Sequence, residues 1–181
     1  IWLGLVGSEM CIRDRLFPYL GEDSRWFAEG IASYLQYQVM YASGVLDWPQ
    51  AIDRYRGRFK KAASGWRHRR TSIVELSRTV DRNGAFVRLY WGGAAYFLAV
   101  DQRLAKEKSL RLNQVIRRYM NCCYQPWGMD ADGMMKKMNE LSGSQVFTEV
   151  YAETVSRPGF PETAAALEWL ARHPPPMLGN Q

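Results

Sequence analysis

Histidine and cysteine, the residues most used in metal sites and nucleophilic sites, are scarce in this 181-residue chain. The two histidines, His68 and His173, stand far apart and outside any metal-ligand spacing. Cys11 belongs to a segment discounted below, so the cysteines that remain are the adjacent Cys122 and Cys123. Adjacent cysteines build neither a disulfide framework nor a metal-ligand motif, and no spacing supports a Cys–His nucleophile pair. Both histidines are expected at the surface, and the redox compartment stays open.

Long apolar runs are also missing. The longest, from Leu89 to Val100, has 12 residues and is bounded by Arg88 and Asp101. A membrane span needs about 20 apolar residues, so this run predicts a buried helix and no transmembrane segment. The apolar residues 1–6 do not form a targeting peptide, because a basic region and an initiator Met are lacking and charged residues replace the cleavage site.

Residues 4–15, with the sequence GLVGSEMCIRDR, resemble the translation of one reading frame of a sequencing-library transposase adapter. The match covers 12 successive codons, which chance does not explain. We therefore interpret residues 1–15 as a non-native segment. On this interpretation the natural chain starts near Leu16 as a C-terminal fragment, and Trp2 and Ile12 are expected to lie outside the core.

The chain has no surplus of acidic residues. It contains 24 Lys and Arg and 18 Asp and Glu, which gives a net charge of +6. The basic residues are scattered, with one cluster at Arg67, Arg69 and Arg70. That cluster lacks the interleaved aromatic side chains on which nucleic-acid bases stack. The charge therefore predicts a solvated basic face and no nucleic-acid partner.

Apolar residues at helical spacing alternate with capping and helix-breaking residues along the chain. Asp23 or Ser24 is expected to cap the first helix, Asp47 with Pro49 to open the second, and Ser109 to cap the fourth. The expected helices span residues 25–43, 47–64, 86–106, 110–123, 130–141, 144–156 and 161–172. Neither an internal repeat nor an extended period-2 strand pattern is present, which predicts an all-α fold.

Two stretches break this series of helices. Residues 66–84 are interpreted as a long loop that holds one short element at most, with the Asn83–Gly84 pair as a turn signal. Residues 174–176 are all proline, which predicts an extended tail over residues 174–181. Residues 16–173 are expected to form one helical domain, long enough for a sizeable core.

Glu29 is the first candidate for chemistry. Its helix has an apolar stripe that includes Phe27 and Ile31, whereas Glu29 lies on the other side. A solvent-exposed glutamate is one interpretation. Gly30 costs a helix interior about 1 kcal/mol relative to Ala, and with the small Ala32 it favours a second helix that approaches closely. A carboxylate at such a contact suits a shared metal site.

The segment Trp26–Tyr34, WFAEGIASY, resembles W-x-x-E-G-x-(A/T)-x-Y of the gluzincin zinc metallopeptidases. It is found in the aminopeptidase N family and in the glycyl aminopeptidase family, whose members often carry a PDZ domain. In both families this Glu is the third zinc ligand, after an H-E-x-x-H helix with two His ligands and the general-base Glu. The resemblance implies that Glu29 is a zinc ligand.

A second segment, Leu89–Ala94, LYWGGA, is similar to Y-x-x-G-A of the same families, where the Tyr donates a hydrogen bond to the tetrahedral oxyanion. From position 29 to position 90 is 61 residues, a separation seen in the aminopeptidase N family. A phenol with an ordinary pKa of about 10 stays protonated at neutral pH and can donate in this way. The resemblance implies that Tyr90 is catalytic. The alternative is a core Tyr, but the Gly92–Gly93 pair favours close approach of a substrate or a backbone.

The chain departs from the family pattern because it contains no H-E-x-x-H. At the aminopeptidase N spacing, the two His ligands would stand at Val6 and Met10, inside the adapter-like segment; at the longer glycyl aminopeptidase spacing they would lie upstream. The resemblance thus implies that this chain is the multi-helix C-terminal subdomain of a thermolysin-like catalytic domain. It implies a parent protein that hydrolyses peptide or protein substrates with zinc. Without the N-terminal part of that domain, the chain is expected to be inactive and to bind zinc poorly.

Two other interpretations stay open. The chain could belong to a degenerate gluzincin retained as a peptide-binding or scaffold module, in which case the uncut sequence would also lack H-E-x-x-H. It could instead be an unrelated all-α interaction domain, with Glu29 and Tyr90 on different faces and more than about 10 Å apart. The metallopeptidase interpretation expects both side chains in one open cleft. Aminopeptidase or endopeptidase activity, substrate preference, compartment and oligomeric state are not decided by these residues.

Overall fold

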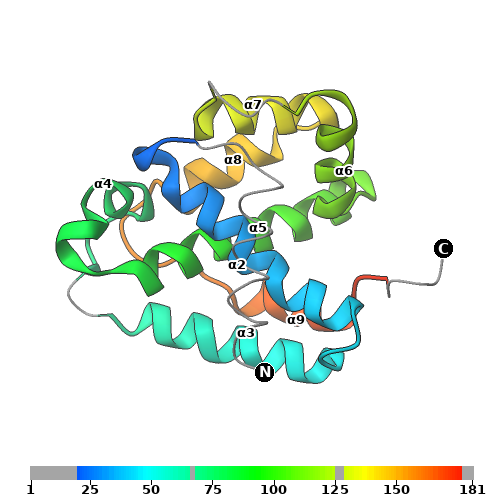
Figure 1. The fold of residues 1–181 in the computed structure, drawn as a ribbon, viewed down its shortest axis with the longest axis horizontal. Coiled ribbons are helices and arrows are strands. Elements are labelled where there is room, and N and C mark those ends of the chain that lie inside the picture. Colours follow the sequence, from blue (N-terminus) through cyan, green and yellow to red (C-terminus); the bar gives the residue numbers. More distant parts are fainter. Residues whose placement is uncertain (1–19, 66–67, 125–128, 177–181) are drawn as a thin grey trace.

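The computed structural model describes residues 20–65, 68–124 and 129–176 (Figure 1). The elements are η1 (Glu22–Ser24), α2 (Arg25–Ala42), α3 (Trp48–Ala63), α4 (Ile73–Asn83), α5 (Phe86–Lys108), α6 (Leu112–Cys122), α7 (Ala131–Ser142), α8 (Val146–Glu153) and α9 (Ala164–Arg172). Within the described ranges no strand forms, and one isolated antiparallel bridge joins Ser72 to Pro158. The all-α prediction is confirmed. The predictions for residues 1–15, including Trp2 and Ile12, lie outside the described residues.

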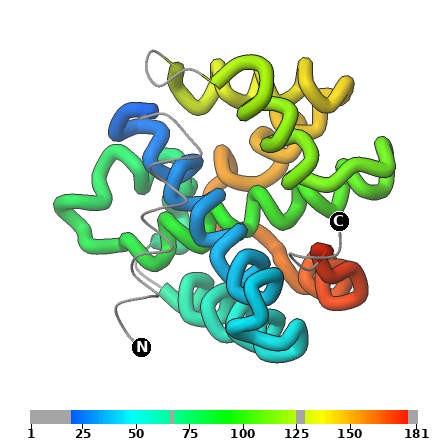
Figure 2. Tube along the Cα trace, turned by 45° about the vertical axis from the view of Figure 1, so that its right-hand side comes forward, coloured from blue at the N-terminus to red at the C-terminus, as the bar shows by residue number. Residues whose placement is uncertain are grey.

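Helix α5 is the centre of the domain and packs against α2, α3, α4, α6, α8 and α9. Figure 2 shows α3 on one side of the crossed α2 and α5, and α6 and α7 on the other. Residues 89–100 of α5 are buried, except for the half-buried Tyr90 and Ala99. The predicted buried helix is therefore confirmed. Among the described helices, none has the length and hydropathy that a membrane crossing requires.

The core around α5 is strongly aromatic. Trp26 of α2 meets Tyr96 of α5 edge to face at a centroid distance of 5.2 Å, and Phe27 meets Phe97 in the same way at 4.8 Å. Such pairs contribute about 0.5–1.5 kcal/mol beyond the area that they bury. These contacts fix the position of the first turns of α2, where Glu29 lies, against α5.

Helices α2 and α5 touch through glycine residues. A Cβ atom on Gly30 would lie 2.6 Å from the Cα of Gly93, and a Cβ atom on Gly93 would lie 2.8 Å from the Cα of Gly30. The latter would also collide with the carbonyl oxygen of Trp26. The predicted close approach at Gly30 is therefore confirmed, with Gly93 as its partner. Gly92 instead makes room for the side chain of Ile73 from α4.

The predicted loop over residues 66–84 is wrong for residues 73–83, which form α4. A capping box opens this helix: the Ser72 hydroxyl accepts from the backbone N–H of Glu75 at 3.1 Å, and the Glu75 carboxylate accepts from the Ser72 N–H at 2.8 Å. Gly84 ends the helix with a φ of 69°. The Asn83–Gly84 signal therefore marks a helix end.

Replacing Ser72 by alanine is expected to lower the free energy of unfolding by about 1 kcal/mol, because the first turn of α4 loses its side-chain cap. Urea unfolding of both proteins measures the change. Ser64→Ala is the matched control, since the exposed Ser64 hydroxyl donates to the carbonyl of Lys61 and its loss should cost less than about 0.5 kcal/mol. Equal losses for the two variants would contradict a stabilising role for the cap.

Two other predicted caps differ in the structure. Ser24 stands before α2, but its hydroxyl accepts from the N–H of Ala131 at 3.0 Å and so joins the start of α2 to α7. Ser109 ends α5 with a left-handed φ of 53°, and α6 begins only after Arg111. The cap predicted at Asp47 is confirmed, because its carboxylate accepts from the N–H of Gln50 at 2.8 Å.

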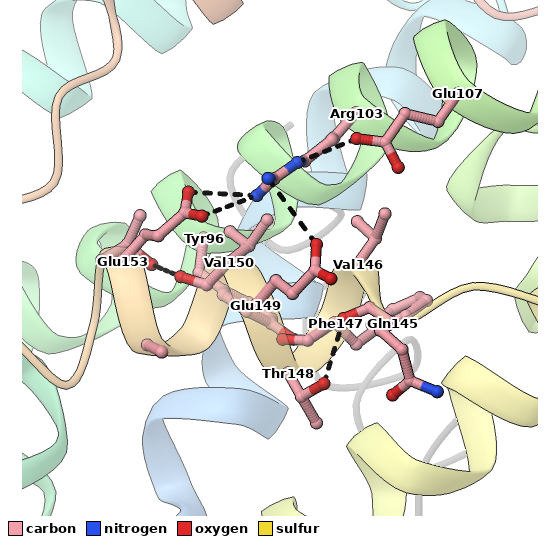
Figure 3. Close-up of polar contacts among 12 residues, drawn as sticks. Tyr96, Arg103, Glu107, Gln145, Val146, Phe147, Thr148, Glu149, Val150 and Glu153 are labelled. Atoms are coloured by element: carbon pink, nitrogen blue, oxygen red, sulfur yellow. Dashed lines mark hydrogen bonds and ion pairs between the residues drawn. The ribbon is translucent and has the colours of Figure 1, made fainter.

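Ion pairs join α8 to the second half of α5 (Figure 3). Arg103 of α5 contacts Glu153 at 3.0 Å and Glu149 at 3.6 Å on α8, and Glu107 on its own helix at 3.0 Å. Isolated exposed ion pairs contribute about 0–1 kcal/mol. Three carboxylates that share one guanidinium need less side-chain ordering for each pair, so this cluster holds α8 in place beside the core.

A disulfide joins Cys122 and Cys123 at the end of α6. The adjacent spacing of Cys122 and Cys123 did not predict this bond. Because the bond links adjacent residues, it connects no separate elements of the fold.

Candidate functional site

Glu29 lies in α2 beside the crossing with α5, and its side chain is half-buried. Phe27 and Ile31 of the predicted apolar stripe are buried, but so is Trp26, which lies on the same side as Glu29. Helix α2 is therefore packed on more than one side. Glu29 is therefore not fully exposed to solvent.

Tyr90 lies in the first half of α5 and is also half-buried. Glu29 and Tyr90 line the same pocket, which has a volume of about 150 Å³. The other lining residues are Ala32, Ser33, Arg58, Val87 and Trp91. The two candidates thus line one pocket. The glycine contact between α2 and α5 is what brings their backbones together.

Aromatic packing supports one wall of this pocket. Trp91 is 5% exposed; its ring stacks on Tyr37 at 5.8 Å and meets Phe59 of α3 edge-on at 5.3 Å. The hydroxyl of Tyr37 accepts a hydrogen bond from Nε of Arg58 at 3.3 Å. Helix α3 therefore contributes a positioned guanidinium to the pocket of Glu29 and Tyr90. No spacing in the sequence connected Arg58 to these residues.

A second cation stands at the start of α2. Arg25 donates to the carboxylate of Asp81 on α4 at 2.8 Å. This hydrogen bond raises the pKa of Arg25, against the opposing effect of burial, and the same bond lowers the pKa of Asp81. The pair connects the helix of Glu29 to α4. It is largely exposed and adds little to stability.

The side chains that the structure describes do not form a complete zinc site. In residues 20–65, 68–124 and 129–176, no three His, Cys, Asp or Glu side chains gather closely enough to hold a metal ion. Glu29 is the carboxylate of its pocket, where Arg58 is a competing cation. Zinc sites in enzymes use three protein ligands. The described residues therefore do not by themselves provide the three ligands of such a site.

Neither histidine lines this pocket. His173 is exposed, as predicted, and its ring stacks on Trp169 at a centroid distance of 5.1 Å. His68 is half-buried and lines a separate pocket beside Arg88, so its predicted place at the surface is only partly correct.

No family model, no curated protein and no solved structure matches the chain. The candidate site therefore rests on its own residues, their spacing and their geometry.

Proposed function

We propose that the chain is part of a zinc-dependent metallopeptidase of the gluzincin type, whose parent protein hydrolyses peptide bonds. Glu29 is proposed as a zinc ligand and Tyr90 as the donor to the oxyanion. The observation that carries the proposal is that these two residues, from two motifs on different helices, line one pocket. A thermolysin-like origin of the helical subdomain is part of the same proposal.

In this proposal Glu29 supplies one carboxylate oxygen ligand, and two histidines of an H-E-x-x-H helix from the N-terminal part of the domain supply the others. The bound ion would polarise the scissile carbonyl and activate a water molecule. The 181-residue chain contains no H-E-x-x-H. By itself it is therefore expected to bind zinc weakly and to have no peptidase activity.

Tyr90 is proposed to act after the attack on the carbonyl. A protonated phenol donates a hydrogen bond to the oxygen on which negative charge develops, and this interaction is stronger in the transition state than in the ground state. The packed wall around Trp91 and the half-burial of Tyr90 favour this role, because a donor in a partly dry, ordered pocket needs little reorganisation.

The source DNA tests the proposal most directly. We expect the uncut reading frame to encode H-E-x-x-H upstream of Leu16, and the purified product to bind zinc and cleave peptide substrates. Sequencing that frame and assaying the product with and without a chelator gives the answer. A frame without H-E-x-x-H would remove the hydrolase proposal and leave a degenerate peptide-binding or scaffold module as the function to test.

A further inference from the structure

A second pocket lies on the other side of Val87, between the end of α3 and the turn that joins α4 to α5. Its volume is about 290 Å³. It is lined by Lys61, Ala62, Gly65, His68, Asn83, Gly84, Ala85, Val87 and Arg88. Among these described lining residues there are three basic side chains and no carboxylate. The pocket thus has a cationic lining with apolar walls.

Arg88 is the unusual member of this lining, because it is only 5% exposed and has no ion-pair partner among the described residues. Its Nη1 atom donates to the carbonyl oxygens of Ala62 at 3.1 Å and Ala63 at 3.4 Å, at the end of α3. Its Nε atom is buried and has no hydrogen-bond partner among the residues that the structure describes. Buried charges are normally paired, so the cation has unused capacity to bind an anion.

The described residues around Arg88 do not supply that anion. Burial and, after it, the charge of Arg69 lower the pKa of Arg88. The carboxylates of the neighbouring α4 are engaged elsewhere: Asp81 pairs with Arg25, and Glu75 accepts from the cap of its own helix. The guanidinium lies over the ring of Phe160 at 5.4 Å, a contact that compensates only part of the desolvation of a buried cation.

We propose that this pocket binds a small oxyanion, a carboxylate or a phosphate, through Arg88, Lys61 and His68. Arg88 is the buried anchor, since a guanidinium can donate two parallel hydrogen bonds to a pair of oxygens on either a carboxylate or a phosphate. Lys61, which is exposed, and the half-buried His68 complete the cationic lining. The volume accommodates a small organic anion and excludes a large cofactor. This site is independent of the proposed peptidase function.

Titration of the full chain with inorganic phosphate and with succinate tests the proposal, with sodium chloride at matched ionic strength as the control. Amide NMR signals of Gly65, Gly84 and Val87, which line the pocket, report binding. We expect saturable shifts in the millimolar range with at least one of the two anions. Phosphate alone would identify a phosphate site, succinate alone a carboxylate site, and both a general oxyanion site. Absence of saturable shifts with either anion would overturn the proposal.

Three variants separate this pocket from a general basic surface. Arg88→Gln should weaken binding at least about tenfold, because the charged hydrogen bonds of the anchor are lost. Since Arg88 also holds the end of α3, Lys61→Gln provides a variant that leaves the fold intact, with an expected loss of about threefold. Lys60→Gln removes the same charge from an exposed neighbour that does not line the pocket, and should leave the affinity unchanged. Equal losses for Lys60→Gln and Lys61→Gln would overturn the proposal.

Discussion

In the complete protein, Glu29→Ala is expected to weaken zinc binding and to lower peptidase activity strongly. Two histidines alone hold the ion weakly, because the usual catalytic site has three protein ligands. We expect less than stoichiometric zinc after dialysis and a kcat/KM reduced by at least about 100-fold. Metal analysis of the purified variant, followed by an assay with added zinc, separates the loss of the ion from a loss of fold. Stoichiometric zinc in Glu29→Ala would contradict the ligand assignment.

Tyr90→Phe is the informative companion, because it removes one hydroxyl from the same pocket and leaves the carboxylate in place. It is expected to retain zinc and fold but to lose about 100-fold in kcat, the effect of removing one oxyanion donor. Tyr151→Phe is the matched control, a half-buried tyrosine of α8 that does not line the pocket. An unchanged kcat in Tyr90→Phe would show that Tyr90 is a packing residue even if Glu29 binds zinc.

Most of the helices could be predicted from local signals. Asp47 with Pro49 opens α3, and the long apolar run after Arg88 forms the centre of α5. Helix α4 was missed although its Ser72-x-x-Glu75 capping box is legible in the sequence. The buried side chains of α4 form a narrow stripe within a highly polar segment. The polar composition therefore favours a loop, whereas the capping box correctly indicates a helix.

The ends of the central apolar run show what sequence alone does not reveal. In the sequence Arg88 and Asp101 bound this run as charged residues, but in the fold they are buried, at 5% and 1% exposure. Asp101 is surrounded by donors: the Tyr34 hydroxyl at 2.6 Å, the N–H of Leu112 at 2.7 Å and the guanidinium of Arg111 at 2.9 Å. These partners come from other elements, and their tertiary placement decides whether a charge at the edge of a run is solvated or buried.

The candidate site was also only partly predictable from the sequence. Glu29 and Tyr90 could be proposed from two short motifs, and Gly30 predicted that another backbone would come close. That Gly93 is the contacting residue, and that Arg58 of α3 joins the pocket, depends on how three helices cross. The spacing of glycines along the sequence does not reveal which of them contact each other. A close approach needs small residues on both helices at the point where the helices cross.

The crossing itself can be tested with Gly93→Ala. The new methyl group would meet the carbonyl oxygen of Trp26 and the Cα atom of Gly30, which are backbone atoms and cannot rotate away. The helices must then separate, and the expected loss is about 2 kcal/mol or more in the free energy of unfolding. The cost of separating the helices exceeds the gain of about 1 kcal/mol that replacing glycine by alanine brings to a helix interior. Gly93→Ala is therefore expected to be less stable than the unmodified chain. Urea unfolding of the full chain measures the net effect.

Gly57→Ala is the matched control, because Gly57 lies inside α3, is exposed, and an added Cβ atom would find nothing within 4 Å. It should stabilise the chain by up to about 1 kcal/mol, the opposite sign from Gly93→Ala for the same chemical change. If both variants were stabilised, the contact between Gly30 and Gly93 would not be what positions α2 against α5. The placement of Glu29 and Tyr90 in one pocket would then need another cause, since this contact brings together the backbones of the two helices that carry them.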